Sequence, residues 1–165
     1  MNILGAAGTT NTAIFRPVEG VSEESLMIMV ILEKISDERR KVVSFAWRDS
    51  LLDEVEEIIR TCSNEGWDGY DAEPISRESG FRVAQLIELL PEGIQMPNVV
   101  AEPTGDIALE WLRGNEKHFT LSITGPQLVY AGIFGGSDKR YGEKRFLQEL
   151  PSATLEILTS YFPEA

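Results

Sequence analysis

Three carboxylates and two large aromatic side chains fall within ten residues, from Trp67 to Ser76. Asp68, Asp71 and Glu73 could coordinate a hard cation such as calcium, which takes several oxygen ligands from one loop. The spacing lacks the alternate-position carboxylates and the closing glutamate of a helix–loop–helix calcium site. Turn formation explains Asp68 and Asp71 more simply. We therefore predict no metal and no cofactor, and keep a metal-dependent enzyme that uses this loop as an alternative.

The aromatic residues of the same loop suggest recognition of a partner, because aromatic side chains dominate binding hot spots. For Trp67 the simpler interpretation is that the ring fills core volume between two helices and a sheet. For Tyr70 the two interpretations are evenly balanced. The candidate partner-binding residues are Trp67, Asp68, Tyr70, Asp71 and Glu73 of the loop, with Asp53, Glu56 and Glu57 of the helix before it.

His118 is the only histidine, and with Ser122 and a carboxylate it could form a hydrolytic set. No strained nucleophile turn surrounds Ser122. His118 lies on the strand face opposite Phe119 and Leu121, so we expect it to be exposed. We predict no catalytic residue, and the sequence favours a protein that is not an enzyme.

The net charge of −12 comes entirely from the middle of the chain. Residues 49–110 hold fifteen acids against Arg60, Arg77 and Arg82. Such a surface repels nucleic acids and anionic lipids and suits a basic protein partner, although solubility alone also explains it. A basic cluster near residue 140 could touch nucleic acid, or could dock the acidic helix of a second copy. It comprises Lys139, Arg140, Lys144 and Arg145.

Cys62 is the single cysteine, so no internal disulfide forms, and a reducing cytoplasm is the natural location. We see no signal peptide in the first residues. The longest apolar run, Leu26 to Leu32, is far too short to cross a bilayer. It could instead form an interface between copies, which leaves a structural subunit of a homo-oligomer as another alternative.

Two amphipathic helices are predicted, one before and one after the aromatic loop that contains Trp67 to Ser76. Ser50 can cap the first, Asp53 falls near its positive end, and Gly66 follows its last turn. Ser76 can cap the second helix. That helix ends at Pro91 and buries Val83, Leu86, Ile87 and Leu90.

The part of the chain before residue 50 is ambiguous. Residues 1–20 contain several glycines and a proline and are expected to be irregular. Two apolar blocks, Leu26 to Leu32 and Val42 to Trp47, favour a β-hairpin around the polar stretch 36–40. A helix is the alternative, because apolar residues continue from Val43 to Cys62 at three- and four-residue steps.

After residue 100 the apolar period changes to two. Residues 107–112, 118–123 and 128–134 predict an antiparallel meander with one buried face, in which Trp111 belongs to the core. Gly135 to Asp138 is expected to end it, and a last helix from Pro151 to Phe162 follows. The prediction is a single domain, 1–165, with an α+β fold: two amphipathic helices on a small antiparallel meander, and a C-terminal helix.

The pattern of residues 50–134 resembles a family of uncharacterised bacterial proteins. In that family a Trp-Asp-Gly-Tyr loop with Ala-x-Pro-x-Ser joins two helices, and the second helix ends in Leu-Pro. A proline-flanked strand entry and a Gly-x-Ile-x-Leu-x-Trp hairpin follow. Asp71 departs from the small residue expected there. The resemblance brings no activity or cofactor. The matching positions are Trp67 to Ser76, Leu90-Pro91, Pro97, Pro103, Gly105, Leu109 and Trp111.

These features together predict a non-catalytic acidic regulatory protein that acts through protein–protein contacts. An inhibitor, or an immunity or antitoxin-like neutraliser of a basic protein, would fit, because acidic surfaces steer fast docking to basic clefts.

Overall fold

The computed structural model describes residues 23–164, so the irregular start predicted for residues 1–20 lies outside the described residues. Contacts divide the chain into two compact units, Met1–Asp37 and Glu38–Ala165. The second unit contains every strand and most of the helical residues of the described chain. It is the unit that holds the aromatic loop.

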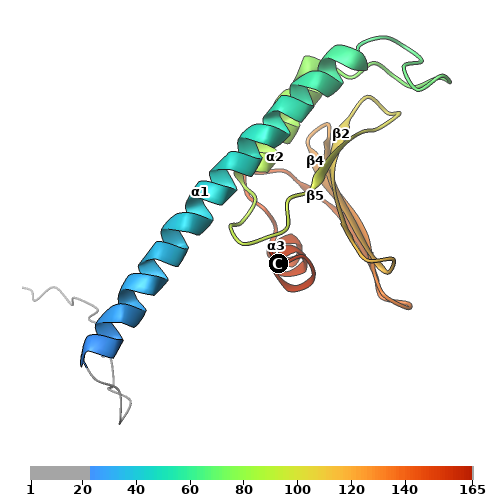
Figure 1. Ribbon diagram of the computed structural model, residues 1–165. Helices are drawn as coiled ribbons and strands as arrows, with labels where there is room; N and C mark the ends of the chain where they lie inside the picture. The colour runs from blue at the N-terminus through green and yellow to red at the C-terminus, as the bar shows by residue number, and fades with distance from the viewer. Residues whose placement is uncertain (1–22, 165) are drawn as a thin grey trace, which may run out of the picture. The chain divides into compact units, whose positions relative to one another are not determined.

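One long helix, α1 (Glu23–Thr61), replaces the predicted hairpin (Figure 1). The hairpin prediction is wrong and the helical alternative is right. No glycine or proline occurs between residues 21 and 65, so nothing in the sequence forces the tight turn that a hairpin needs. Ser50 and Asp53 consequently lie inside the helix and not at its start. Among the described residues, no helix is both long and apolar enough to cross a bilayer.

The second helix, α2 (Arg77–Glu88), follows its prediction closely. The Ser76 hydroxyl accepts a hydrogen bond from the Ser79 amide at 3.1 Å, as an N-cap should. The predicted apolar face is confirmed: Val83, Leu86, Ile87 and Leu90 are all buried. Gly66 has the positive φ typical of a helix-ending glycine, but α1 stops at Thr61, so Gly66 belongs to the loop.

Five antiparallel strands form one sheet, with neighbours in chain order. The predicted meander is confirmed in its three central strands. The apolar pattern by itself did not predict the two edge strands, because one has only four residues and the other carries five charges. Gly135 to Asp138 turns the chain into the last strand and does not end the sheet. The strands are β1 (Asn98–Ala101), β2 (Ile107–Arg113), β3 (Lys117–Thr124), β4 (Gln127–Phe134) and β5 (Lys139–Arg145).

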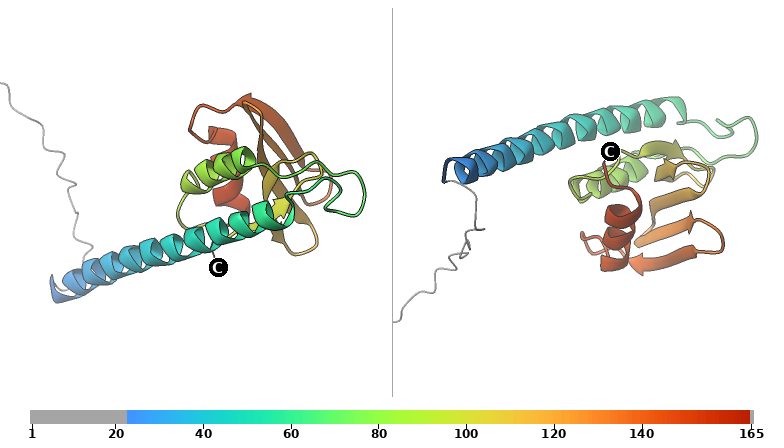
Figure 2. Two further views of the ribbon diagram at one scale, coloured as in Figure 1. Left: turned by 90° about the horizontal axis from the view of Figure 1, so that it is seen from above. Right: turned by 60° about the horizontal axis from the view of Figure 1, so that its bottom comes forward.

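The C-terminal helix α3 (Ser152–Tyr161) begins one residue after Pro151, which is its N-cap and not part of its first turn. Figures 1 and 2 show α2 and α3 on the same face of the sheet. Residues of alternate strand positions, such as Trp111 and Phe119, meet these helices and have no exposed surface. The α+β fold predicted from the sequence is confirmed.

The core joins α1, α2, α3 and the inner face of the sheet. Hydrophobic burial of this kind is the dominant favourable term in folding. A glycine at position 132 leaves room for two rings, since a Cβ there would lie 2.6 Å from Phe134 and 2.9 Å from Phe119. The largest fully buried side chains are Trp111, Phe119, Phe162, Leu51, Leu86, Ile87, Ile94, Ile107, Leu109, Leu121, Leu128 and Ile157.

Candidate functional site

The aromatic loop, residues 62–76, connects α1 to α2 and is held at several points. The Ile75 amide donates to the Cys62 carbonyl at 2.8 Å, which closes the base of the loop. Within the loop, the Gly66 amide donates to the Ala72 carbonyl at 2.8 Å. The Glu73 amide donates to the carbonyl of Pro103, also at 2.8 Å, and so ties the loop to the turn before β2. The backbone of this connector is therefore fixed by its own hydrogen bonds.

Trp67 faces inward from this loop. Its side chain is half-buried and packs against the hydrophobic core, and its indole nitrogen donates to the Glu73 carbonyl at 2.9 Å. A buried indole usually finds such a partner. The ring thus holds the two arms of the loop together and is not presented freely to solvent.

Asp68 faces back toward the loop's own backbone. Its Oδ1 accepts from the Tyr70 amide at 2.9 Å and from the Ala72 amide at 3.4 Å. The turn-forming role predicted for Asp68 is confirmed. Among the described residues, no group of three histidine, cysteine or acidic side chains is placed to hold a metal ion. Asp68, Asp71 and Glu73 accordingly do not converge on one point.

Tyr70 has the opposite orientation to Trp67, because 86% of its surface is exposed. It follows Gly69, whose φ of +87° is a backbone conformation that other residues rarely adopt. Asp71 and Glu73, next along the loop, are exposed as well. The loop therefore presents one aromatic ring beside two carboxylates on a backbone that is held in place.

The acidic residues predicted on the preceding helix lie on its surface. Asp53, Glu56 and Glu57 are all exposed on α1. Glu57 accepts from Arg60 Nε at 2.9 Å, and this hydrogen bond, with the charge of Arg60, lowers the pKa of Glu57. The pairing stays within α1, so it brings no positive charge from another element.

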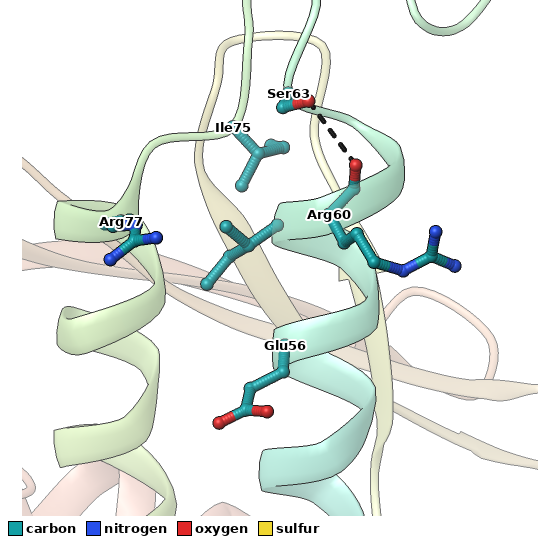
Figure 3. Close-up of a pocket in the computed structure, with 6 residues that line it drawn as sticks. Glu56, Arg60, Ser63, Ile75 and Arg77 are labelled. Atoms are coloured by element: carbon teal, nitrogen blue, oxygen red, sulfur yellow. Dashed lines mark hydrogen bonds between the residues drawn. The ribbon is translucent and has the colours of Figure 1, made fainter.

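A groove of about 710 Å³ opens between the end of α1 and the start of α2. Ile59 and Ile75 contribute apolar side chains to its lining. Glu56 and Arg77 contribute opposite charges (Figure 3). Figure 3 shows the Arg60 guanidinium turned away from Arg77. Of these residues, the sequence analysis named only Glu56 as a candidate site residue. The others could not be identified because the pattern of one helix does not show which other helix packs beside it. The lining residues are Glu56, Ile59, Arg60, Ser63, Ile75 and Arg77.

His118 is half-exposed on the outer face of the sheet, as its strand position predicts. Its Nε2 lies 2.7 Å from Glu110 Oε1 and 3.3 Å from Thr120 Oγ1. Ser122, the candidate nucleophile of the hydrolytic alternative, is buried. The structure therefore brings His118 together with a carboxylate across the β2–β3 pair, but not with an accessible serine.

A hollow of about 260 Å³ lies beside His118, over strands β3, β4 and β5. Lys139 and the 82% exposed Tyr141 line it from β5. Arg140, their neighbour in the predicted basic cluster, bonds Asp138 and the Tyr161 hydroxyl, with 2.8 Å between Nη2 and that oxygen. One of the four clustered cations is thus engaged in the protein's own structure.

The site as a whole combines a fixed aromatic loop, exposed carboxylates on α1 and a groove between two helices. No protein-family model matches the chain, and neither the curated proteins nor the solved structures include a significant match to it.

Proposed function

We propose that the protein is a non-catalytic acidic regulator that binds a basic partner protein through the loop 62–76 and the adjoining surface of α1. One observation carries the proposal: Tyr70 is 86% exposed on a loop whose backbone is held by Asp68, Trp67 and Pro103. A binding loop that is already ordered loses little conformational freedom on docking, so its contacts convert into affinity efficiently. Rigid, exposed tyrosines serve this purpose at many recognition surfaces.

Charge supports a basic partner. Asp71 and Glu73 follow Tyr70 in the loop and are exposed as well, and Asp53, Glu56 and Glu57 lie on the helix that leads into the loop. Residues 49–110 carry fifteen acids and three arginines, so their summed field attracts cations before contact. Such steering raises the association rate and weakens as salt screens it. An inhibitor or an immunity-type neutraliser of a basic enzyme would have these properties.

The test is capture from the native host with immobilised wild type and a Tyr70→Ala variant. Tyr141→Ala is the matched control, because Tyr141 is 82% exposed and lies in β5, outside the loop. We expect one basic protein to be retained by wild type and by the control, and to be lost or greatly reduced with Tyr70→Ala. With the purified partner, removal of a hot-spot ring should weaken binding about 30-fold or more.

Salt provides a second readout on the purified pair. Binding should weaken steadily as ionic strength rises, mainly through a slower association rate. Equal recovery of the same partner by wild type and Tyr70→Ala would show that the loop does not bind the partner. An affinity that does not change with salt concentration would show that the acidic surface does not contribute to binding.

A further inference from the structure

The first part of α1 carries an unusual apolar surface. Seven large apolar side chains in residues 27–35 are each exposed by 50% to 68%. Proteins rarely leave a contiguous apolar surface of this kind in water unless something binds it. A helix also gains most of its stability from packing, and none of the described residues covers these side chains. The seven are Met27, Ile28, Met29, Val30, Ile31, Leu32 and Ile35.

The apolar side chains surround the whole helix. Met27 to Leu32 are six consecutive residues, and successive residues of an α-helix are rotated by about 100°, so together they cover its full circumference. A helix that rests on a lipid surface needs a polar face toward water, which this segment lacks. The run is also far too short to span a bilayer. Partners on more than one side satisfy the geometry best.

The type and spacing of the isoleucines point to other helices as those partners. Ile28, Ile31 and Ile35 recur at steps of three and four, which is the spacing of a coiled-coil seam. Isoleucine at both alternating seam positions favours bundles of three or four helices over pairs. Leu32 lies next to the seam and widens the apolar contact, which also favours a bundle of three or four helices.

Charge allows copies of this segment to approach one another. Directly after the apolar run, residues 33–41 hold three acids and four bases, so the region is nearly neutral. Residues 49–110, in contrast, carry the whole net charge of −12 and repel their counterparts. Charge therefore does not oppose self-association at the beginning of α1, whereas it disfavours contact between the acidic parts of two copies.

We infer that residues 27–35 bind the same segment of other copies and form a bundle of three or more helices. This inference does not depend on the proposed partner of the aromatic loop. Assembly would gather several acidic units and several copies of Tyr70. A multivalent partner would then be bound more tightly without any new contact.

The experiment measures the mass of the full-length chain by sedimentation equilibrium over a wide range of concentration. The variant is Ile31→Glu with Ile35→Glu, which keeps good helix formers in place and puts charges on the seam. Leu147→Glu is the control, because Leu147 is 65% exposed and lies outside α1. We expect wild type and control to reach the mass of a trimer or a larger assembly, and the double variant to be monomeric. Tryptophan fluorescence should show an unchanged thermal transition of the second unit in all three proteins.

Four results would overturn the inference. Wild type could be monomeric at every concentration, or the double variant could assemble as wild type does. A chain that lacks residues 1–22 could assemble while the full chain does not, which would assign the apolar surface to that segment. Monomeric wild type could instead float with phosphatidylcholine vesicles while the double variant does not, which would mean that the apolar surface of residues 27–35 binds lipid.

Discussion

Arg48, in the middle of α1, reaches the end of α2: its Nη2 lies 2.6 Å from the carbonyl oxygen of Leu90. Its Nε also points to the Ile87 carbonyl, at a longer 3.4 Å. Ile87 belongs to the last turn of α2, whose carbonyls carry the negative end of the helix dipole, and Leu90 lies just beyond the helix, so a guanidinium is favourable at this position. Only 9% of Arg48 is exposed. This contact fixes α2 against α1 and therefore sets the positions of the groove and of the loop between them.

Replacement of this cation should weaken the fold. Arg48→Met keeps the length of the side chain but removes the donors, and we expect a loss of about 2–3 kcal/mol, because hydrogen bonds to charged groups are strong when buried. Urea denaturation followed by tryptophan fluorescence measures it. Arg60→Met is the control, since Arg60 pairs with Glu57 on the surface, and its midpoint should match wild type. Similar losses for the two variants would contradict the assignment.

Asp68→Ala should loosen the loop, because the Asp68 carboxylate holds the loop backbone. The variant loses the acceptor for the amides of Tyr70 and Ala72, which we expect to lower stability by about 1 kcal/mol. The more specific effect is faster amide hydrogen exchange at these two positions. Mass spectrometry of exchanged peptides measures it, with Asp71→Ala as the control. The loop model fails if Asp71→Ala speeds exchange as much.

Glu102 should make stability depend on pH. Burial, together with the nearby charge of Asp106, raises the pKa of Glu102 above 4.5, and the Ser122 hydroxyl offsets this only in part. Because the pKa of Glu102 is raised in the folded state, the group's contribution to stability is fully present below about pH 4.5. That contribution is lost as the pH rises through the folded-state pKa. Glu102→Gln should therefore raise the unfolding temperature at neutral pH.

The gain should be no more than about 1 kcal/mol, since part of the group stays in water. Thermal unfolding at a series of pH values should show the difference from wild type vanish below about pH 4.5. Glu65→Gln, at an exposed carboxyl, is the control and should follow wild type throughout. A constant difference at every pH would mean that the charge of Glu102 is not its cause.

Gly132→Ala should destabilise the sheet. The new Cβ would lie 2.6 Å from one core ring and 2.9 Å from another, those of Phe134 and Phe119. Overpacking of this kind costs about 1–3 kcal/mol because neither ring can move without disturbing its neighbours. Chemical denaturation measures the loss. Ala131→Ser, at the exposed neighbouring position, should leave stability within about 0.5 kcal/mol of wild type.

Thr154→Val should stabilise the protein. Thr154 has no exposed surface, and among the described residues its hydroxyl oxygen finds no hydrogen-bond partner. Replacing this group by a methyl should raise stability by about 1 kcal/mol, or roughly 2–4 °C in the unfolding temperature. Thr159→Val, where the hydroxyl bonds the Leu155 carbonyl on the surface of the same helix, should bring no gain. A lower melting temperature for Thr154→Val would show that the hydroxyl is satisfied in solution.

The sequence by itself determined the elements whose apolar spacing was regular. The second helix, its Ser76 cap, the central strands and the burial of Trp111 all followed from local pattern, because a periodic face has one favourable orientation toward a core. The short strand β1 and the charged strand β5 have no such pattern, and they form only because the sheet offers them an edge to pair with.

Tertiary structure alone decided the rest. Residues 25–48 suit a strand or a helix by composition, and the continuous helix became evident only in the fold. The core position expected for Trp67 is confirmed, whereas the sequence left Tyr70 evenly balanced between core and surface. Their difference arises from contacts with distant parts of the chain: the loop is anchored at Pro103, Trp67 packs on the core, and Tyr70 is left in solvent. Such contacts depend on how the helices and the sheet pack together, which no local pattern specifies.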